Sequence, residues 1–395
     1  MNPQSASEPA YPPAFWGTAA ALLVVQTGFG AILPLLPVFV RQRGFPLSDI
    51  GVMAAAYAAV AFVAQLGLGV WADRVGRKWL IVAGCLLEVV GTGGFLAHIN
   101  PWWYIGFRVV QGLGSGAVVP AANALVADLV DESRRGRAYG IMAASSSAGF
   151  AVGPVLGGLA GAVWGLSAPF VVGVILNAGA AIMSAVSLPT HHSTPRNSSP
   201  RGDALWPMAF RLWPYFAVMF VWMGLAGMYD TSWSLYMRWL GAGPRVIGVS
   251  FTLFAGPLLI FNVWSGRIAD RARRRHLVIL GGLALQALTV CCYIFSRSVW
   301  LSIAIAVIEA FAISLTGPAL SAAVMEGVPQ RYNGAVQGLF QASGTLGSAV
   351  LALASGPLLV IRPNHPFILG SILLTLVTLA AAGWWRPWRM PQNAL

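Results

Sequence analysis

Long apolar runs recur along the whole chain of 395 residues. Each run has roughly 20 residues, the length that an α-helix needs to cross the hydrocarbon core of a bilayer. Twelve spans are expected, at residues 16–40, 48–71, 79–98, 102–126, 137–161, 165–188, 213–238, 246–268, 276–295, 299–325, 333–358 and 364–385. Inside a bilayer the backbone N–H and C=O groups must be satisfied within the protein, which favours helices. The sequence therefore predicts an all-α polytopic membrane protein.

The composition agrees with this fold class. Charged residues make up 9% of the chain, hydrophobic residues make up 57%, and the mean hydropathy is +0.72. A soluble domain carries about 25% charged residues. The apolar runs are continuous, whereas the strands of an outer-membrane barrel alternate apolar and polar residues. A soluble domain and a barrel are therefore both excluded.

The net charge of +12 raises the question of a nucleic-acid partner. The basic residues are scattered over short loops and form no single patch, so no nucleic acid is expected. With the N-terminus placed in the cytoplasm, seventeen of the 24 basic residues fall in cytoplasmic segments and six in outer segments. By the positive-inside rule, this asymmetry predicts a plasma (inner) membrane protein with both termini in the cytoplasm.

One long polar segment, residues 188–203, interrupts the apolar runs after the sixth span. It is rich in proline and serine and is expected to form a flexible linker. The predicted domain organisation is a cytoplasmic tail at 1–15, a six-helix bundle at 16–188, a cytoplasmic linker at 189–212, a second six-helix bundle at 213–385 and a cytoplasmic tail at 386–395.

A basic loop occurs once in each half of the chain. Residues 69–78 read GVWADRVGRK, and residues 266–275, which lie 197 positions later, read GRIADRARRR. Three further pairs keep an offset of 198: Pro120 and Pro318, Asp128 and Glu326, and Gly140 and Gly338. The two halves are therefore a parallel repeat related by an axis along the membrane normal. Many secondary transporters are built in this way.

Four motifs occur on the first span, in the loop that follows the second span, and on the fourth and fifth spans. They are Gly28-x5-Pro34-x2-Pro37, the loop from Gly69 to Lys78, Arg108-x2-Gln111-Gly112, and Gly149-x3-Gly153-Pro154-x2-Gly157-Gly158. In this order the motifs resemble those of the major facilitator superfamily, and in particular its twelve-helix drug:proton antiporter branch. The resemblance covers nearly the whole chain and implies two pseudo-symmetric six-helix bundles, the fold of that superfamily.

The first basic loop is interpreted as a conformational latch. Its predicted members are Gly69, Asp73, Arg74, Gly76, Arg77, Lys78 and, after the fourth span, Asp128. A carboxylate such as Asp73 can accept hydrogen bonds from a helix start, and the family implies the helix that begins near residues 333–334. The latch would stabilise the outward-facing state. The alternative is a loop that only sets topology. The second copy has Arg273 in place of Gly76, so unequal gates are expected.

The fifth span is rich in small residues. Gly149, Gly153, Gly157 and Gly158 allow close helix contact in a lipid environment. Pro154 removes one backbone donor and can bend the helix. The span is predicted to pack and flex at a central cavity, and the alternative is a closely packed helix with no role in gating.

Four charged residues lie inside predicted spans: Glu88, Arg108, Asp230 and Glu309. Charges in a bilayer are costly and are functional candidates by default. A carboxylic acid in a dry site favours its neutral form, so it can load and release protons. The resemblance implies a proton-transfer role for Arg108 alone, whereas the three acids are inferred from their positions. The alternatives are structural ion pairs between helices and acids close to the headgroups.

A substrate cavity is expected to be lined by deep aromatic and polar side chains. The candidates are Gln26, Gln111, Asn123, Trp222, Tyr229, Trp233, Asn262 and Trp264. Aromatic rings suit lipophilic and often cationic molecules through stacking and cation–π contacts. The same side chains could instead face lipid or hydrogen-bond between helices.

The predicted function is proton-coupled export of lipophilic, drug-like small molecules by alternating access. The proton gradient is the only energy source expected, with no cofactor and no metal, and the protein is expected to act as a monomer surrounded by lipid. Two alternatives stay open: a transporter of the same fold for a dedicated sugar, metabolite or glycolipid, and a non-transporting membrane sensor or interaction protein. The sequence contains no nucleophile–base pair, phosphate loop or metal cluster, so an enzyme is not expected.

Overall fold

The computed structural model describes residues 11–97, 100–131, 134–190, 210–271, 275–326, 328–329 and 332–384. Within these ranges the chain forms α-helices and one short 3₁₀ helix, η1 (Leu47–Asp49), and no strand. The helices are α1 (Pro13–Ile32), α2 (Leu36–Gln42), α3 (Ile50–Val75), α4 (Arg77–Gly94), α5 (Trp103–Leu129), α6 (Arg135–Trp164), α7 (Ala168–Ser187), α9 (Trp213–Trp239), α10 (Pro244–Arg271), α11 (Arg275–Phe295), α12 (Val299–Met325), α13 (Asn333–Ile361) and α14 (His365–Trp384). The predicted all-α fold is confirmed.

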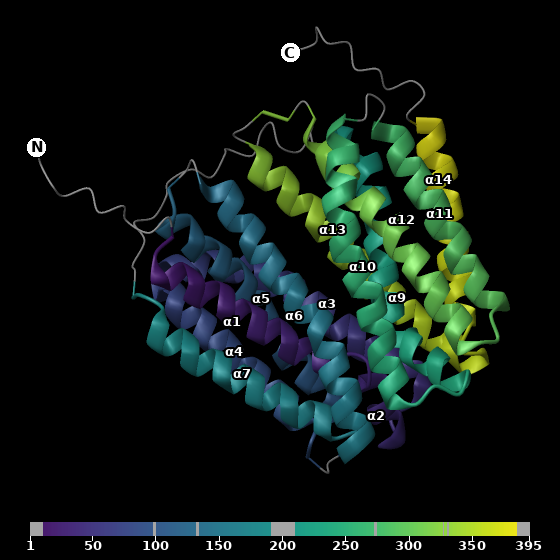
Figure 1. The fold of residues 1–395 in the computed structure, drawn as a ribbon, viewed down its shortest axis with the longest axis horizontal. Coiled ribbons are helices and arrows are strands. Elements are labelled where there is room, and N and C mark those ends of the chain that lie inside the picture. The colour runs from purple at the N-terminus through teal and green to yellow at the C-terminus, as the bar shows by residue number, and fades with distance from the viewer. Residues whose placement is uncertain are drawn as a thin grey trace, which may run out of the picture. The chain divides into compact units, whose positions relative to one another are not determined.

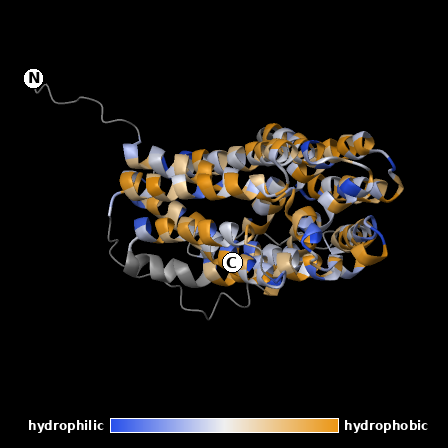
Figure 2. Cartoon of the chain, turned by 90° about the horizontal axis from the view of Figure 1, so that it is seen from below, coloured by the Kyte–Doolittle hydropathy of each residue, from blue (hydrophilic) through white to orange (hydrophobic). Residues whose placement is uncertain are grey.

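Ten of these helices are long and apolar enough to cross a membrane. Apolar residues predominate along the helices (Figure 2). Two further long helices, α4 and α9, fall short of that standard for different reasons. Helix α4 carries Arg77, Lys78 and Glu88 within its 18 residues, and α9 is rich in Trp and Tyr, whose polar atoms lower its hydropathy. A count of twelve spans therefore stays a prediction.

The first predicted span, residues 16–40, is wrong as a single helix. Helix α1 ends at Ile32, residues 33–35 form a turn, and α2 begins at Leu36. Pro34 and Pro37 have no backbone N–H, so neither can donate the hydrogen bond that would continue a regular helix through this point. The two prolines that contribute to the family resemblance are thus also the physical cause of the break.

Packing divides the chain into two compact units. The first contains Met1–Leu33 and Val60–Asn197, and the second contains Pro34–Ala59 and Ser198–Leu395. In the first unit α1, α4 and α7 lie side by side (Figure 1), with α6 packed on α1 and α5 packed on α4. In the second unit α13 packs on α9, and α12 contacts both α10 and α11. The segment 34–59 precedes the linker in sequence but packs on α9 and α13 of the second unit.

Glycines of α6 allow α1 to approach very closely. A Cβ atom placed on Gly153 would lie 2.8 Å from the backbone nitrogen of Ala31, and a Cβ on Gly157 would meet the Ala31 carbonyl oxygen. In the second unit a Cβ on Gly347 of α13 would likewise meet the carbonyl oxygen of Phe220 in α9. Small residues permit such contacts where lipid offers no hydrophobic drive for helices to associate. These glycines therefore position α1 against α6 in the first unit and α9 against α13 in the second.

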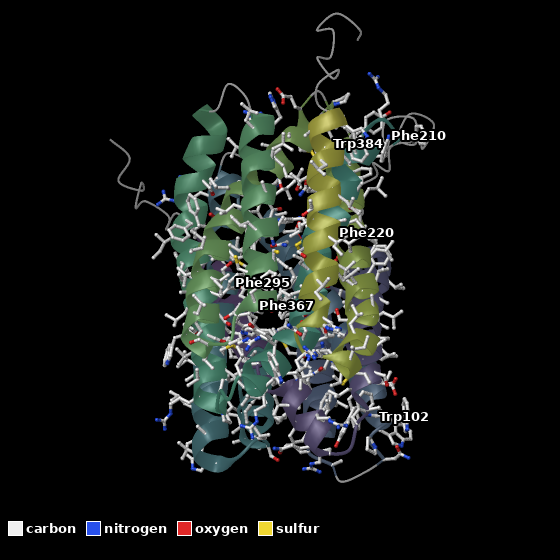
Figure 3. All side chains as sticks on the ribbon, turned by 90° about the vertical axis from the view of Figure 1, so that its right-hand side faces the viewer. Trp102, Phe210, Phe220, Phe295, Phe367 and Trp384 are labelled. Atoms are coloured by element: carbon white, nitrogen blue, oxygen red, sulfur yellow. The ribbon has the colours of Figure 1, made fainter. Side chains whose placement is uncertain are left out.

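Large apolar side chains cover parts of the outer surface. Val186 is 82% exposed and Phe295 is 76% exposed, as expected for side chains that face hydrocarbon. In the second unit Trp384 and Phe210 lie at the same end (Figure 3), and the rings of Trp384 and Trp213 are 4.6 Å apart. Tryptophan is enriched at membrane–water interfaces, so this end of the unit has the chemistry of an interface anchor.

Candidate functional site

A buried polar cluster lies between α4 and α5 of the first unit. Nη1 of Arg108 donates to Oε1 of Gln111 at 3.1 Å, and Nε2 of Gln111 donates to Oγ1 of Thr92 at 2.9 Å. Glu88, one turn before Thr92 on α4, is buried and interacts electrostatically with Arg108. We call these four residues the first polar cluster. It brings together two of the four charges predicted inside the spans.

Two glycines explain why polar side chains can occupy this narrow space. A Cβ atom on Gly114 would lie 3.1 Å from Cγ of Glu88, and a Cβ on Gly91 would lie 2.6 Å from Cγ of Gln111. The absence of a side chain at each glycine gives room to the polar residue on the opposing helix. The sequence of α4 and α5 thus places Glu88 and Gln111 inside the helix pair.

The second unit holds a different arrangement around Glu309 of α12. The Tyr229 hydroxyl of α9 donates to both carboxylate oxygens, at 2.7 and 2.8 Å, and the Tyr293 hydroxyl of α11 donates to Oε2 at 2.8 Å. Nε2 of Gln286 donates to Oε1 at 3.4 Å. We call these four residues the second polar cluster. Three neutral donors from two other helices therefore surround one buried carboxylate.

Aromatic rings pack around the second polar cluster. The ring of Phe367, near the start of α14 (Figure 3), lies 5.1 Å from that of Tyr293 and 5.8 Å from that of Tyr229. Trp233 is buried, its ring is 5.2 Å from Tyr293, and its Nε1 donates to Oγ of Ser250 at 3.0 Å. Trp233, predicted as a cavity residue, is thus part of the packed wall behind Glu309.

The other candidates occupy separate places. Gln26 of α1 donates to Oγ of Ser146 of α6 at 3.0 Å, so it hydrogen-bonds between helices. A Cβ on Gly317 would lie 3.1 Å from the ring of Trp222, which places that indole against α12. Asn123 and Asp230 are half-buried. The side chains of Asn262 and Trp264 lie outside the described residues.

Three polar residues of the two clusters are absent from the predicted site: Thr92, Gln286 and Tyr293. Gln286 and Tyr293 are seven residues apart, so they share one face of α11. That spacing was a usable signal, because a polar pair two turns apart inside an apolar span indicates a buried polar face. Thr92 carried no such signal. In the described part of the chain, no group of three His, Cys, Asp or Glu residues is placed to hold a metal ion.

The loop between α3 and α4 contains one position that requires glycine. Gly76 has φ +91°, a left-handed conformation in which a side chain is strained. The next residue, Arg77, forms an ion pair with Asp128, which is distant in sequence. Arg77 also donates to the carbonyl oxygen of Ala124. The loop thereby joins α4 to the end of α5. Nζ of Lys78 lies 5.5 Å from the centroid of the Trp79 ring.

The second half has an ion pair at the equivalent positions. Nη1 of Arg275 lies 3.8 Å from Oε2 of Glu326, and both residues are 198 positions after Arg77 and Asp128. This pair is more exposed than the first, so solvent weakens it. The inequality of the two gates stays a prediction. Gly69 lies within α3, and the side chains of Asp73 and Arg74 lie outside the described residues.

A charge exchange tests whether the Arg77–Asp128 pair supports transport. Arg77→Ala should slow transport several-fold, since the loop loses a partly buried ion pair worth about 1 kcal/mol. The double exchange Arg77→Asp with Asp128→Arg should recover part of that loss in a transport assay at equal surface expression. Arg275→Ala is the matched control at the exposed pair and should have a smaller effect. Equal effects of Arg77→Ala and Arg275→Ala would contradict the assignment.

These features define a class of protein before any relative is considered. Two repeated helical units, each with a buried glutamate among polar partners, are typical of secondary transporters. The family model of the Major Facilitator Superfamily matches residues 18–239 and again residues 215–394. The chain therefore belongs to the Major Facilitator Superfamily. The expected membrane transporter for a small-molecule substrate is confirmed, and the family and the fold are those of a transporter and not of an enzyme class, as expected.

Several relatives are resistance proteins. The chain is 26% identical over 347 residues to the tetracycline resistance protein, class C, of Escherichia coli. The alignment covers 84% of this chain and 85% of that protein. It is 28% identical over 393 residues to the tetracycline resistance protein, class G, of Vibrio anguillarum. This alignment covers 93% of this chain and 92% of that protein. It is 24% identical over 402 residues to multidrug resistance protein 2 of Bacillus subtilis (strain 168), covering 94% of each.

Solved structures show the same fold. The nucleoside transporter NupG superposes with a TM-score of 0.78 at 12% identity, covering 94% of this chain and 99% of that one. A bacterial homolog of the human lysosomal transporter Spinster, in an inward-facing and occupied conformation, superposes with a TM-score of 0.77 at 13% identity, covering 94% and 96%. At this identity the likeness establishes the multi-pass fold of the superfamily.

Proposed function

We propose that the protein exports lipophilic, drug-like molecules in exchange for protons. The observation that carries the proton half of this proposal is the setting of Glu309. The residue is 1% exposed, and its hydrogen-bond donors Tyr229, Tyr293 and Gln286 are neutral. Neutral donors stabilise a charge less than a cationic partner does, and burial disfavours the charged form. Such a carboxylate can accept a proton on one side of the membrane and release it on the other.

The substrate half rests on relatives and on aromatic chemistry. The relatives are named for resistance to tetracycline, to quinolones or to several drugs. Tyr229 is half-buried and contacts Glu309, while its ring lies 6.0 Å from that of Trp233. Trp222 contributes a further indole, whose Nε1 has no hydrogen-bond partner among the described residues. Aromatic faces and one spare donor suit a large apolar molecule that carries few polar groups.

In this mechanism, the protonation state of the acids couples proton movement to drug movement. A proton from outside neutralises Glu309. The uncharged cluster then permits the protein to change from the outward-facing to the inward-facing state. Release of that proton to the cytoplasm restores the charge. The drug moves in the opposite direction through the same alternating cycle. Arg108 acts on the other acid, since its charge lies near Glu88. The protein is proposed to work as a monomer in the inner membrane, with both termini in the cytoplasm.

Reconstituted liposomes test the function directly. A pH gradient should drive accumulation of ethidium, a lipophilic cation whose charge is independent of pH, and collapse of the gradient with a protonophore should release it. Tetracycline and a fluoroquinolone extend the test to the compounds for which relatives are named. Protein-free liposomes give the background leak.

Each alternative predicts a different result. A transporter of a dedicated sugar, metabolite or glycolipid would leave all three drugs at background while one defined natural compound drives proton movement. A sensor or interaction protein would move no proton with any compound. Drug transport that is independent of the pH gradient would contradict proton coupling but would still support the proposal that the protein transports drugs.

A further inference from the structure

The third and fourth long helices of the two units correspond residue by residue. Three contacting positions keep an offset of 198: Gly84 with Gly282, Gly114 with Ala312, and Val118 with Thr316. A Cβ atom on either glycine would meet the carbonyl oxygen of the first partner and the side chain of the second. The same helix contact therefore occurs in α4–α5 and in α11–α12, which fixes the register of the repeat in three dimensions.

In this register the buried acids occupy exchanged positions. Glu88 corresponds to Gln286, and Gln111 corresponds to Glu309. Each unit thus holds one glutamate and one glutamine at the same two places, with the acid on α4 in the first unit and on α12 in the second. All four side chains are at most 1% exposed. A pair of positions that keeps one acid in each half, on opposite helices, points to a shared chemical task.

Glu88 has one carboxylate oxygen that is poorly suited to a permanent charge. Its Oε2 is buried and has no hydrogen-bond partner among the described residues. A fixed buried carboxylate needs both oxygens paired, because an unpaired buried charge is very costly. Arg108 is the charged residue of α5 near Glu88, and α7, which also packs on α4, contains no ionisable residue. The site can therefore hold a neutral acid and the ionised form in alternation.

Glu309 has a different neighbourhood. Tyr229 and Tyr293 donate to it, and Tyr236 and the half-buried Asp230 are the other titratable residues on the central part of α9. Helix α13 contains no ionisable residue, and the described side chains of α10 include Arg245 at its start. The two acids thus have unlike partners, a guanidinium in one unit and phenols in the other.

We propose that Glu88 and Glu309 form two proton-binding sites, one in each unit, so that each transport cycle carries two protons. This inference rests on the proposed proton coupling and adds its stoichiometry. Each carboxylate takes one proton from the outer side to give the neutral acid and releases one proton to the cytoplasm.

The number of protons can be read from the substrate gradient that a pH gradient balances. With the membrane potential clamped at zero, one pH unit balances about a tenfold ethidium gradient for one proton and about a hundredfold gradient for two. At one pH unit, the net ethidium flux through the wild-type protein should reverse at an ethidium gradient of about a hundredfold. In Glu88→Gln or in Glu309→Gln it should reverse at a gradient of about tenfold. A cooperative melting transition in detergent, compared with that of the wild type, shows whether each variant is folded.

A transposed variant provides the matched control. Gln286→Glu combined with Glu309→Gln moves the acid of the second unit to the place that Glu88 occupies in the first. The two side chains are 3.4 Å apart, so the exchange can retain their hydrogen bond. This variant should return the reversal point to about a hundredfold, whereas a purely structural role for Glu309 predicts no recovery.

Wild-type reversal at tenfold, or hundredfold reversal in either single variant, would overturn the two-site proposal and leave proton coupling intact. A complete lack of pH-driven flux in the wild type would instead refute the proposed function itself. The wild-type measurement decides the stoichiometry even if a variant fails to fold.

Discussion

Replacing Glu88 and Glu309 together by glutamine should abolish pH-driven ethidium accumulation. Glutamine keeps the size of glutamate and, like the protonated acid, offers both a donor and an acceptor, but it cannot exchange a proton in this range. Downhill ethidium exchange should continue, because the helices and their packing glycines are unchanged. The measurement is accumulation and exchange in the same liposome preparation, with the protein amount matched.

The matched control for the double variant is Asp49→Asn. It makes the same chemical change in η1, where the carboxylate of Asp49 accepts from the Ser48 hydroxyl outside both polar clusters. Accumulation should match the wild type in this control. Continued accumulation in the double variant would assign coupling to another group, and Asp230 on α9 would be the next acid to neutralise.

Gly153→Leu should eliminate transport and lower thermal stability in detergent. The added side chain begins 2.8 Å from the backbone nitrogen of Ala31, and it also meets the carbonyl oxygen of Thr27. Backbone cannot rotate away as a side chain can, so α1 must move off α6, at a cost of about 3 kcal/mol or more. Gly153→Ala should give a smaller loss in both measurements.

Gly140→Leu is the matched control on the same helix. A Cβ on Gly140 would have no heavy atom within 4 Å, so the larger side chain has room. Transport and the melting temperature should stay close to wild type. If Gly140→Leu were as damaging as Gly153→Leu, the α1–α6 contact would not explain the loss, because leucine favours a helix more than glycine does and Gly140 makes no such contact.

The helices and the repeat could be predicted because they depend on local composition. Runs of apolar residues determine a spanning helix wherever they occur, and the duplicated loop is visible without any contact. The span predicted at residues 16–40 is broken in the structure, and it contains Pro34 and Pro37. Hydropathy does not reflect the effect of these prolines on the helix, although each proline lacks a backbone N–H donor.

The site could be predicted only in part. Glu88, Arg108 and Glu309 stand out as charges in apolar spans, and the structure places all three in buried clusters. Their partners are harder to predict, since Thr92 carries no signal, and the spacing of Gln286 and Tyr293 indicates a polar face of α11 without showing which charge it meets. Trp233 shows the converse, because an aromatic residue that suits a cavity is instead packed and hydrogen-bonded to Ser250.

The sequence by itself determined the membrane class, the helical fold, the duplication and the acids that deserve mutation, because these follow from hydropathy, spacing and the cost of charge in lipid. Only the tertiary structure decided which side chains meet. Hydrogen bonds such as Tyr229–Glu309 and Tyr293–Glu309 join residues 80 and 16 positions apart. Their formation depends on glycines that let particular helix faces approach, and that fit is a property of packed pairs of helices, which no single stretch of sequence contains.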